Sequence, residues 1–165
     1  MALEVETGTG SATAESYASV TQADTRLAAL GMTNWATLEV AEKEQALRRA
    51  TQFMEQRYRD KWKGTRLYRA QALSWPRYGA IVDDFDVDST VVPAEVKNAC
   101  ADLAVKALAE DLNPDLTRAV IREKVGPLET EYSAHSPQGT RFVSVDQALG
   151  PFLRGGGANV RLVRA

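Results

Sequence analysis

The residues best suited to chemistry in this sequence are cations and aromatic rings that alternate between positions 57 and 77. They are Arg57, Tyr58, Arg59, Lys61, Trp62, Lys63, Arg66, Tyr68, Arg69, Trp75 and Arg77. A single-stranded nucleic-acid groove uses cations to bind phosphates and rings to stack on bases. The same composition also fits a helix end whose rings pack inward and whose charges contact another subunit. Because the formal net charge is −2, we favour the subunit interface and keep nucleic-acid binding as the alternative.

An acidic segment follows directly, at positions 83–88. Its aspartates are Asp83, Asp84, Asp86 and Asp88. The last three, with Glu95 at the twelfth position, imitate the ligand spacing of a calcium loop. However, the sixth position holds Ser89 where such a loop needs glycine, and Pro93 falls inside the loop. We therefore expect a solvated acidic loop in preference to a calcium site.

Beyond these two segments, the sequence contains none of the motif patterns that indicate an enzyme. The glycines at 155–157 lack the lysine and the helix that complete a phosphate-binding loop, and no GxSxG or HExxH pattern is present. The one cysteine, Cys100, falls on the apolar face of a predicted helix, where we expect a small buried side chain. The one histidine, His135, has no nucleophile or ligand cluster near it in the sequence. We expect no catalytic residue, no metal and no cofactor.

Apolar residues recur at helical spacing along most of the chain, and this predicts a mainly helical fold. Helices are expected over about 20–30, 39–60 and 93–112, the last of them at the centre of the core. Ser19 with Gln22 forms a capping box before the first helix, and Ser144 with Gln147 forms another before a short helix near the C-terminus. Residues 1–18 suggest a short strand or extended arm, followed by a turn.

A β-hairpin is predicted after the central helix. If the chain reverses at residues 126–127, Lys124 lies opposite Glu129 and Arg122 lies opposite Glu131. Both pairs then join opposite charges across an antiparallel register. This agreement between register and charge favours a hairpin over a helix, and a single hairpin needs further packing to be stable.

The length of 165 residues suits one domain. We place it at 1–153, with the hairpin at about 119–132 and a flexible tail at 154–165. The fold class we expect is a small helical bundle with one β-hairpin and extended N- and C-terminal arms. The tail residues are apolar or basic: Arg154, Val160, Arg161, Leu162 and Arg164. Such a tail is either disordered or orders when it docks on a partner.

No apolar run approaches the roughly 20 residues that cross a bilayer, and the N-terminus lacks a basic stretch followed by an apolar one. We therefore expect a cytosolic product, or part of an assembly made in the cytosol, without a membrane partner.

The order of several sequence blocks resembles a family of tailed-phage head-to-tail connector proteins, also called adaptors or head completion proteins. Along the chain these blocks read GTG, SYASV, NWATL, KEQAL, RATQFMEQRY, WKG, ALSWPR, VP before VKNACADLAVKAL, and REKVGPLETEY. Some members of that family are labelled as DnaT-like single-stranded DNA-binding domains. The resemblance extends from Val5 to Leu153, and its specificity lies in the LSWPR and VGPLETEY blocks.

The resemblance implies a structural virion protein without a cofactor. Such a subunit assembles in the host cytoplasm into a ring, expected to have twelve members, in the neck of the virion. The implied partners are the portal protein on one side and a tail-side connector or tail terminator protein on the other. Genomic DNA would pass through the lumen without specific binding, and the C-terminal tail would dock on the portal or an adjoining subunit.

A ring subunit needs two different complementary faces, because contacts around a ring are heterologous. The two charged segments are our candidates for those faces. The interface residues we expect are Arg66, Arg69, Asp83, Asp84 and Asp86. The alternative remains a single-stranded nucleic-acid-binding module that uses Trp62, Tyr68 and Trp75.

Overall fold

The structure is a computed structural model that describes residues 2–115, 122–125, 128–131 and 140–155. In this part of the chain the fold is mainly α, as predicted. Its helices are α1 (Val20–Ala29), α2 (Thr33–Ala36), α3 (Val40–Tyr58), α4 (Ala94–Ala109), α5 (Val143–Leu149) and the 3₁₀ turn η1 (Gly150–Phe152). Its strands form two-stranded antiparallel pairs: β1 (Thr65–Arg66) with β2 (Arg77–Tyr78), β3 (Ile81–Val82) with β4 (Phe85–Asp86), and β5 (Arg122–Val125) with β6 (Leu128–Glu131).

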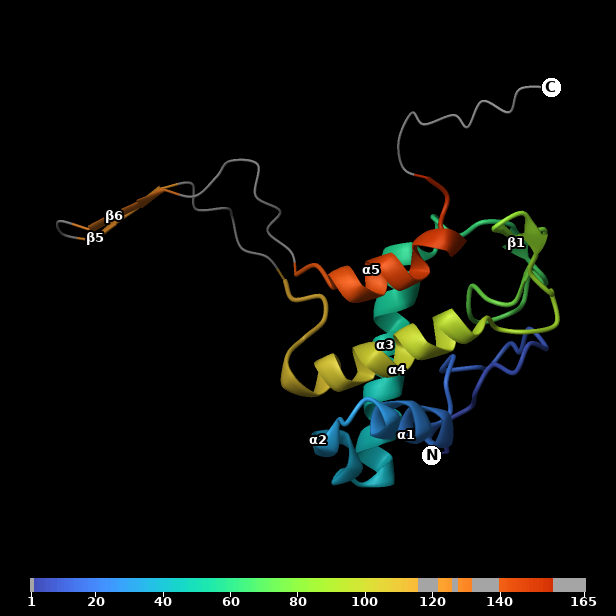
Figure 1. Cartoon of the computed structure of the whole chain (residues 1–165), viewed down its shortest axis with the longest axis horizontal. Helices are drawn as coiled ribbons and strands as arrows, with labels where there is room; N and C mark the ends of the chain where they lie inside the picture. Colours follow the sequence, from blue (N-terminus) through green and yellow to red (C-terminus); the bar gives the residue numbers. More distant parts are fainter. Residues whose placement is uncertain (1, 116–121, 126–127, 132–139, 156–165) are drawn as a thin grey trace.

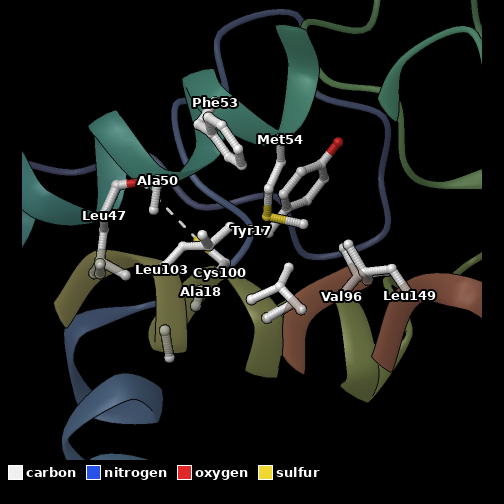
Figure 2. Packing of buried hydrophobic residues seen from close by; sticks show 14 of the residues in the cluster. Tyr17, Ala18, Leu47, Ala50, Phe53, Met54, Val96, Cys100, Leu103 and Leu149 are labelled. Atoms are coloured by element: carbon white, nitrogen blue, oxygen red, sulfur yellow. Dashed lines mark hydrogen bonds between the residues drawn. The ribbon is translucent and has the colours of Figure 1, made fainter. Parts of the chain in front are cut away.

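Helices α3 and α4 cross at the centre of the bundle, and the other helices pack around them (Figure 1). Their apolar stripes face each other, so that Leu47 and Met54 of α3 lie against Cys100 and Leu103 of α4 (Figure 2). Cys100 is fully buried, as expected. The predicted central helix is therefore confirmed, although it is shorter than expected, because Pro93 is its N-cap and the helix ends at Ala109.

The two predicted capping boxes have different outcomes. Ser19 and Gln22 form the first as expected, since the Ser19 hydroxyl accepts from the Gln22 amide at 3.1 Å and the Gln22 side chain accepts from the Ser19 amide at 2.9 Å. The second prediction, Ser144 with Gln147, is wrong, because α5 begins at Val143, two residues before the start that a Ser144 cap would give, and its N-cap Phe142 makes no side-chain hydrogen bond. The position of α5 is therefore determined by burial of its apolar side chains, Val145 and Leu149, and not by a local capping interaction.

The N-terminal segment is extended, as predicted, but it folds back onto the domain instead of leaving it as an arm. The Glu6 carboxylate is buried and accepts hydrogen bonds from the amides of Gly8, Gly10 and Ser11 at 2.8, 3.0 and 2.8 Å. At Gly8 the backbone has φ +110°, and a Cβ atom would lie 1.8 Å from the Thr90 carbonyl oxygen. Glycine is therefore required where this segment crosses the loop before α4.

The β5–β6 pair has the predicted register, with Arg122 opposite Glu131 and Lys124 opposite Glu129. Figure 1 shows this pair to one side of the helical bundle. The remaining residues of the predicted hairpin, and His135, lie outside the described residues. Among the described residues, no helix is long and apolar enough to cross a membrane.

Candidate interaction surfaces

The aromatic residues of segment 57–77 form a buried cluster. Trp62 and Trp75 are both 0% exposed, and their ring centroids lie 5.7 Å apart in an edge-to-face arrangement. Tyr58 packs on Trp62 at 5.8 Å, and Phe152 packs on Trp75 at 5.8 Å. Rings in this position contribute to the core. Neither tryptophan can stack on a nucleic-acid base without unfolding this part of the domain, which corrects the role that the alternative assigned to both.

The segment that follows α5, residues 152–154, packs against this aromatic cluster and is hydrogen-bonded to residues 61–63. Trp62 forms an antiparallel bridge with Leu153, and the Lys63 amide donates to the Phe152 carbonyl at 2.9 Å. The Arg154 amide donates to the Lys61 carbonyl at 2.6 Å. Arg154, assigned to the docking tail from the sequence, is therefore part of the folded domain.

A hydrogen-bond network fixes the turn that carries Trp75. The Glu55 carboxylate accepts from the Ser74 amide at 3.0 Å, from the Ser74 hydroxyl at 2.8 Å and from the Tyr17 hydroxyl. The Tyr17 oxygen in turn accepts from the Ser74 amide at 3.0 Å. Burial, and then the charge of Glu55, raise the pKa of Tyr17 well above its ordinary value. The Trp75–Pro76 peptide bond beyond this network is cis.

Two of the arginines in segment 57–77 are committed to contacts within the domain. The Arg77 guanidinium is buried and donates to the carbonyls of Lys63, Gly64 and Ser74 at 2.6, 2.8 and 3.1 Å, and burial lowers its pKa. Arg57 pairs with Asp146 of α5 at 3.3 Å. The buried Arg77 is not available to bind a phosphate, and Arg57 is already paired with a carboxylate.

Asp146 also accepts a hydrogen bond from the Tyr58 hydroxyl at 2.6 Å, which ties α5 to the end of α3. Burial of Asp146 works to raise its pKa, but the hydrogen bonds from Tyr58 and Arg57 outweigh burial and lower the pKa. Burial, and then the same hydrogen bond, raise the pKa of Tyr58. The carboxylate therefore remains ionised as a structural contact.

The predicted interface residues Arg66 and Arg69 differ in their environment. Arg66 is half-buried, and its guanidinium donates to the Gln71 carbonyl. Arg69 is exposed in the loop between β1 and β2. In the same loop Tyr68 is exposed, and its amide donates to the Gln71 side chain at 2.9 Å. This loop presents one arginine and one tyrosine to solvent.

The acidic segment forms the tight β3–β4 hairpin, which the sequence did not predict. Ile81 lies opposite Asp86 and Val82 opposite Phe85, so that Asp83 and Asp84 form a two-residue turn. Both turn residues have positive φ, 51° and 67°, as a hairpin turn of this length favours. Among the described residues, no group of three or more metal-binding side chains is placed to hold an ion.

The hairpin also exposes large apolar side chains that were not selected from the sequence. Phe85 is 77% exposed and Ile81 is 52% exposed, and Tyr78 on the preceding strand β2 is 69% exposed. The basic segment lies beside this hairpin, since Lys63 Nζ donates to the Ile81 carbonyl at 3.0 Å. We call the region of β1 to β4 the β lobe. The basic and acidic segments therefore lie side by side in this lobe.

Comparison with known proteins places the chain in a family. A family model described as "Putative DnaT-like ssDNA binding protein" matches residues 1–165. The chain belongs to this DnaT-like family. No curated protein matches it, and no solved structure matches it.

The DnaT-like protein has a second exposed apolar surface, on different elements. A groove of about 550 Å³ runs between α1 and the first turns of α4. Most of its surface is apolar, and no carboxylate occurs among the described residues that line it: Thr21, Gln22, Thr25, Arg26, Ala29, Leu30, Ala94, Lys97 and Asn98. We call it the α1–α4 groove. Leu30 is exposed at its edge, and exposed apolar surface of this kind marks interaction sites.

In the DnaT-like protein, the cations on the α1–α4 groove differ in their partners. Arg26 is held by Asp102 of α4, with its Nε and Nη2 atoms 2.8 and 2.7 Å from the carboxylate oxygens. Lys97 lies on the opposite wall and is half-buried. Of the predicted tail residues, Val160, Arg161, Leu162 and Arg164 lie outside the described residues.

Proposed function

We propose that this DnaT-like protein is a structural subunit of a tailed-phage virion. It forms a ring in the neck that joins the capsid portal to the tail and extends the DNA channel. The order of sequence blocks shared with head-to-tail connector proteins supports this role. The ring is expected to be a dodecamer that contacts the portal on one side and a tail-side connector or tail terminator protein on the other.

The observation that carries this proposal is the presence of two chemically different exposed surfaces on different elements. One is the β lobe, where the aspartates of the hairpin surround Ile81 and Phe85. The other is the α1–α4 groove, which is apolar and carries Lys97. A closed ring needs two unlike faces on every subunit, each complementary to the other. In this proposal Arg66, Arg69, Asp83, Asp84 and Asp86 all belong to the first of them.

A second candidate function, single-stranded DNA binding, is favoured by the description of the family. Tyr68 and Tyr78 are exposed on the β lobe, and Arg69 follows Tyr68 in the chain. Two rings and a cation are the elements of a stacking site. This candidate requires binding of single strands by the isolated protein, steeply weakened by salt. Substitution of both tyrosines by alanine would abolish that binding.

The deciding experiment mixes the purified protein with the portal assembly of the same phage and measures co-sedimentation. The connector function predicts that the protein sediments with the portal and is not retained on single-stranded DNA. Absence of co-sedimentation, together with salt-sensitive retention on single strands, would replace this proposal by the DNA-binding one.

The role of the C-terminal tail is tested in the same assay. The chain is ended after residue 155, because Arg154 is hydrogen-bonded into the domain and its removal would disturb the aromatic cluster. A full-length variant with Arg161→Glu and Arg164→Glu is the matched test of charge. If the tail docks on the portal, both changes abolish co-sedimentation. Full binding by both would remove the tail from the portal interface.

A further inference from the structure

The β3–β4 hairpin has the features of an inserting element. Phe85 directly follows the two-residue turn and is 77% exposed, and Ile81 on the facing strand is 52% exposed. Both side chains sit among aspartates, and residues 81–88 contain no lysine or arginine. The hairpin therefore presents apolar side chains next to its own carboxylates, while Lys63 contacts the Ile81 backbone.

The α1–α4 groove has the complementary features. Its volume of about 550 Å³ exceeds that of a phenylalanine side chain, and its floor and walls include Ala29, Leu30 and Ala94. Among the described residues that line it, the charged ones are Arg26, which is paired with Asp102, and Lys97, and none is an aspartate or glutamate. An apolar groove with cations beside it matches an apolar tip with carboxylates beside it.

We propose that the β3–β4 hairpin of one copy docks in the α1–α4 groove of the next copy, with Phe85 in the groove and Asp83 and Asp86 beside Lys97. This contact rests on the ring assembly proposed above and specifies it. The hairpin and the groove are different surfaces. A copy whose hairpin is docked in one neighbour therefore still has a free groove for the hairpin of a second neighbour. Such a heterologous contact continues from copy to copy until a ring closes.

Zero-length crosslinking tests the contact without any substitution. A carbodiimide adds to an aspartate carboxyl to give an activated O-acylisourea ester. The Lys97 amine attacks the carbonyl carbon of this ester and forms an amide, and the carbodiimide-derived group leaves as a urea. Equal amounts of ¹⁵N-labelled and unlabelled protein are mixed, assembled and crosslinked, both on the portal and alone at high concentration. The peptide pair joining Lys97 to Asp83 or Asp86 is then identified by mass spectrometry.

The expected result is mixed-isotope peptide pairs, which can form only between copies, in products that extend beyond dimers. Crosslinks between two like copies also give single-isotope pairs, and random mixing should make these about as frequent as mixed pairs. Single-isotope pairs without any mixed pair would mean that the hairpin lies on the groove of its own chain, and would overturn the proposal. Absence of the crosslink from both samples would also overturn it. If the protein sediments with the portal without this crosslink, the connector function stands and the specified contact fails.

Two substitutions sharpen the test. Phe85→Ser should lower the crosslink yield by about tenfold or more, because burial of a phenylalanine side chain changes an association constant by at least that factor. Ala29→Trp fills the groove and should have the same effect. Its matched control is Ala28→Trp, because Ala28 is exposed but lies about 100° around the helix from Ala29. Equal loss in both tryptophan variants would assign the effect to folding and overturn the groove assignment.

Discussion

Replacement of Glu55 by alanine should destabilise the domain far more than a typical substitution on a helix surface. The hydroxyl hydrogens of Tyr17 and Ser74 would lose their acceptor at buried positions, while the Ser74 amide would keep its bond to the Tyr17 oxygen. Each buried donor left without a partner costs about 1–3 kcal/mol, so the expected loss for the two hydroxyls is about 2–6 kcal/mol. For a domain of this size, the loss corresponds to a fall in Tm of about 4–24 °C.

The loss can be measured by urea denaturation, with near-UV circular dichroism as a probe of Trp75. Glu55→Gln keeps one carbonyl acceptor and should lose about 1–2 kcal/mol, less than alanine. Gln52→Ala, at an exposed position of the same helix, controls for helix propensity and should change stability by about 0.5 kcal/mol or less. If Glu55→Ala were as mild as Gln52→Ala, the network would not fix the turn before Trp75, and this reasoning would be refuted.

Gly64 and Gly79 both have positive φ, but a Cβ atom at Gly64 would lie 2.5 Å from a carbonyl oxygen whereas one at Gly79 meets nothing within 4 Å. By equilibrium denaturation, Gly79→Ala should therefore cost about 1–2 kcal/mol and Gly64→Ala about 1–3 kcal/mol more; equal costs would contradict the clash. The pKa of Asp146 is lowered from its ordinary value of 3.8, so the stability it provides is present above that value and is lost as the pH falls through the lower folded pKa. The Asp146→Asn variant should be less stable than the unsubstituted protein at neutral pH, and it should lose less additional stability than that protein below about pH 4. Denaturant midpoints measured across pH test this. If the dependence of stability on pH in acid were the same in both proteins, that result would count against the Asp146 contacts. Finally, the buried Trp62 and Trp75 should resist quenching by iodide, and single-stranded DNA should leave their emission unchanged; strong quenching would show that the cluster opens.

The aromatic residues of this region differ in burial, and this difference affects both candidate functions. In the sequence, tryptophans with neighbouring cations fit a nucleic-acid groove. In the structure, however, the side chains of Trp62 and Trp75 are buried in the core. Tyr68 and Tyr78 remain outside. Among the described residues of segment 57–78, the rings free to stack on a base are therefore those of Tyr68 and Tyr78 on the β lobe, where a stacking site would compete with the subunit contact proposed for the same lobe.

The sequence by itself determined the elements whose causes are local. The start of α1 follows from Ser19 and Gln22, which are three residues apart and satisfy each other's backbone amides. The buried stripe that contains Cys100 follows from helical spacing. The β5–β6 register agrees with the order of opposite charges along the chain, which pairs Arg122 with Glu131 and Lys124 with Glu129 only if the chain reverses at residues 126–127. In each case the residues that form the pattern are separated by only a few positions, so the pattern can be recognised in the sequence.

Only the tertiary structure decided which side chains remain at the surface. Trp62 is buried because Leu153, far along the chain, pairs with it, and α5 begins where burial places it instead of at the predicted cap. The basic and acidic segments lie together because β1 to β4 form one lobe, and the α1–α4 groove exists only where two distant helices meet. Surfaces are produced by contacts between distant segments, and the energy of those contacts outweighs local preference.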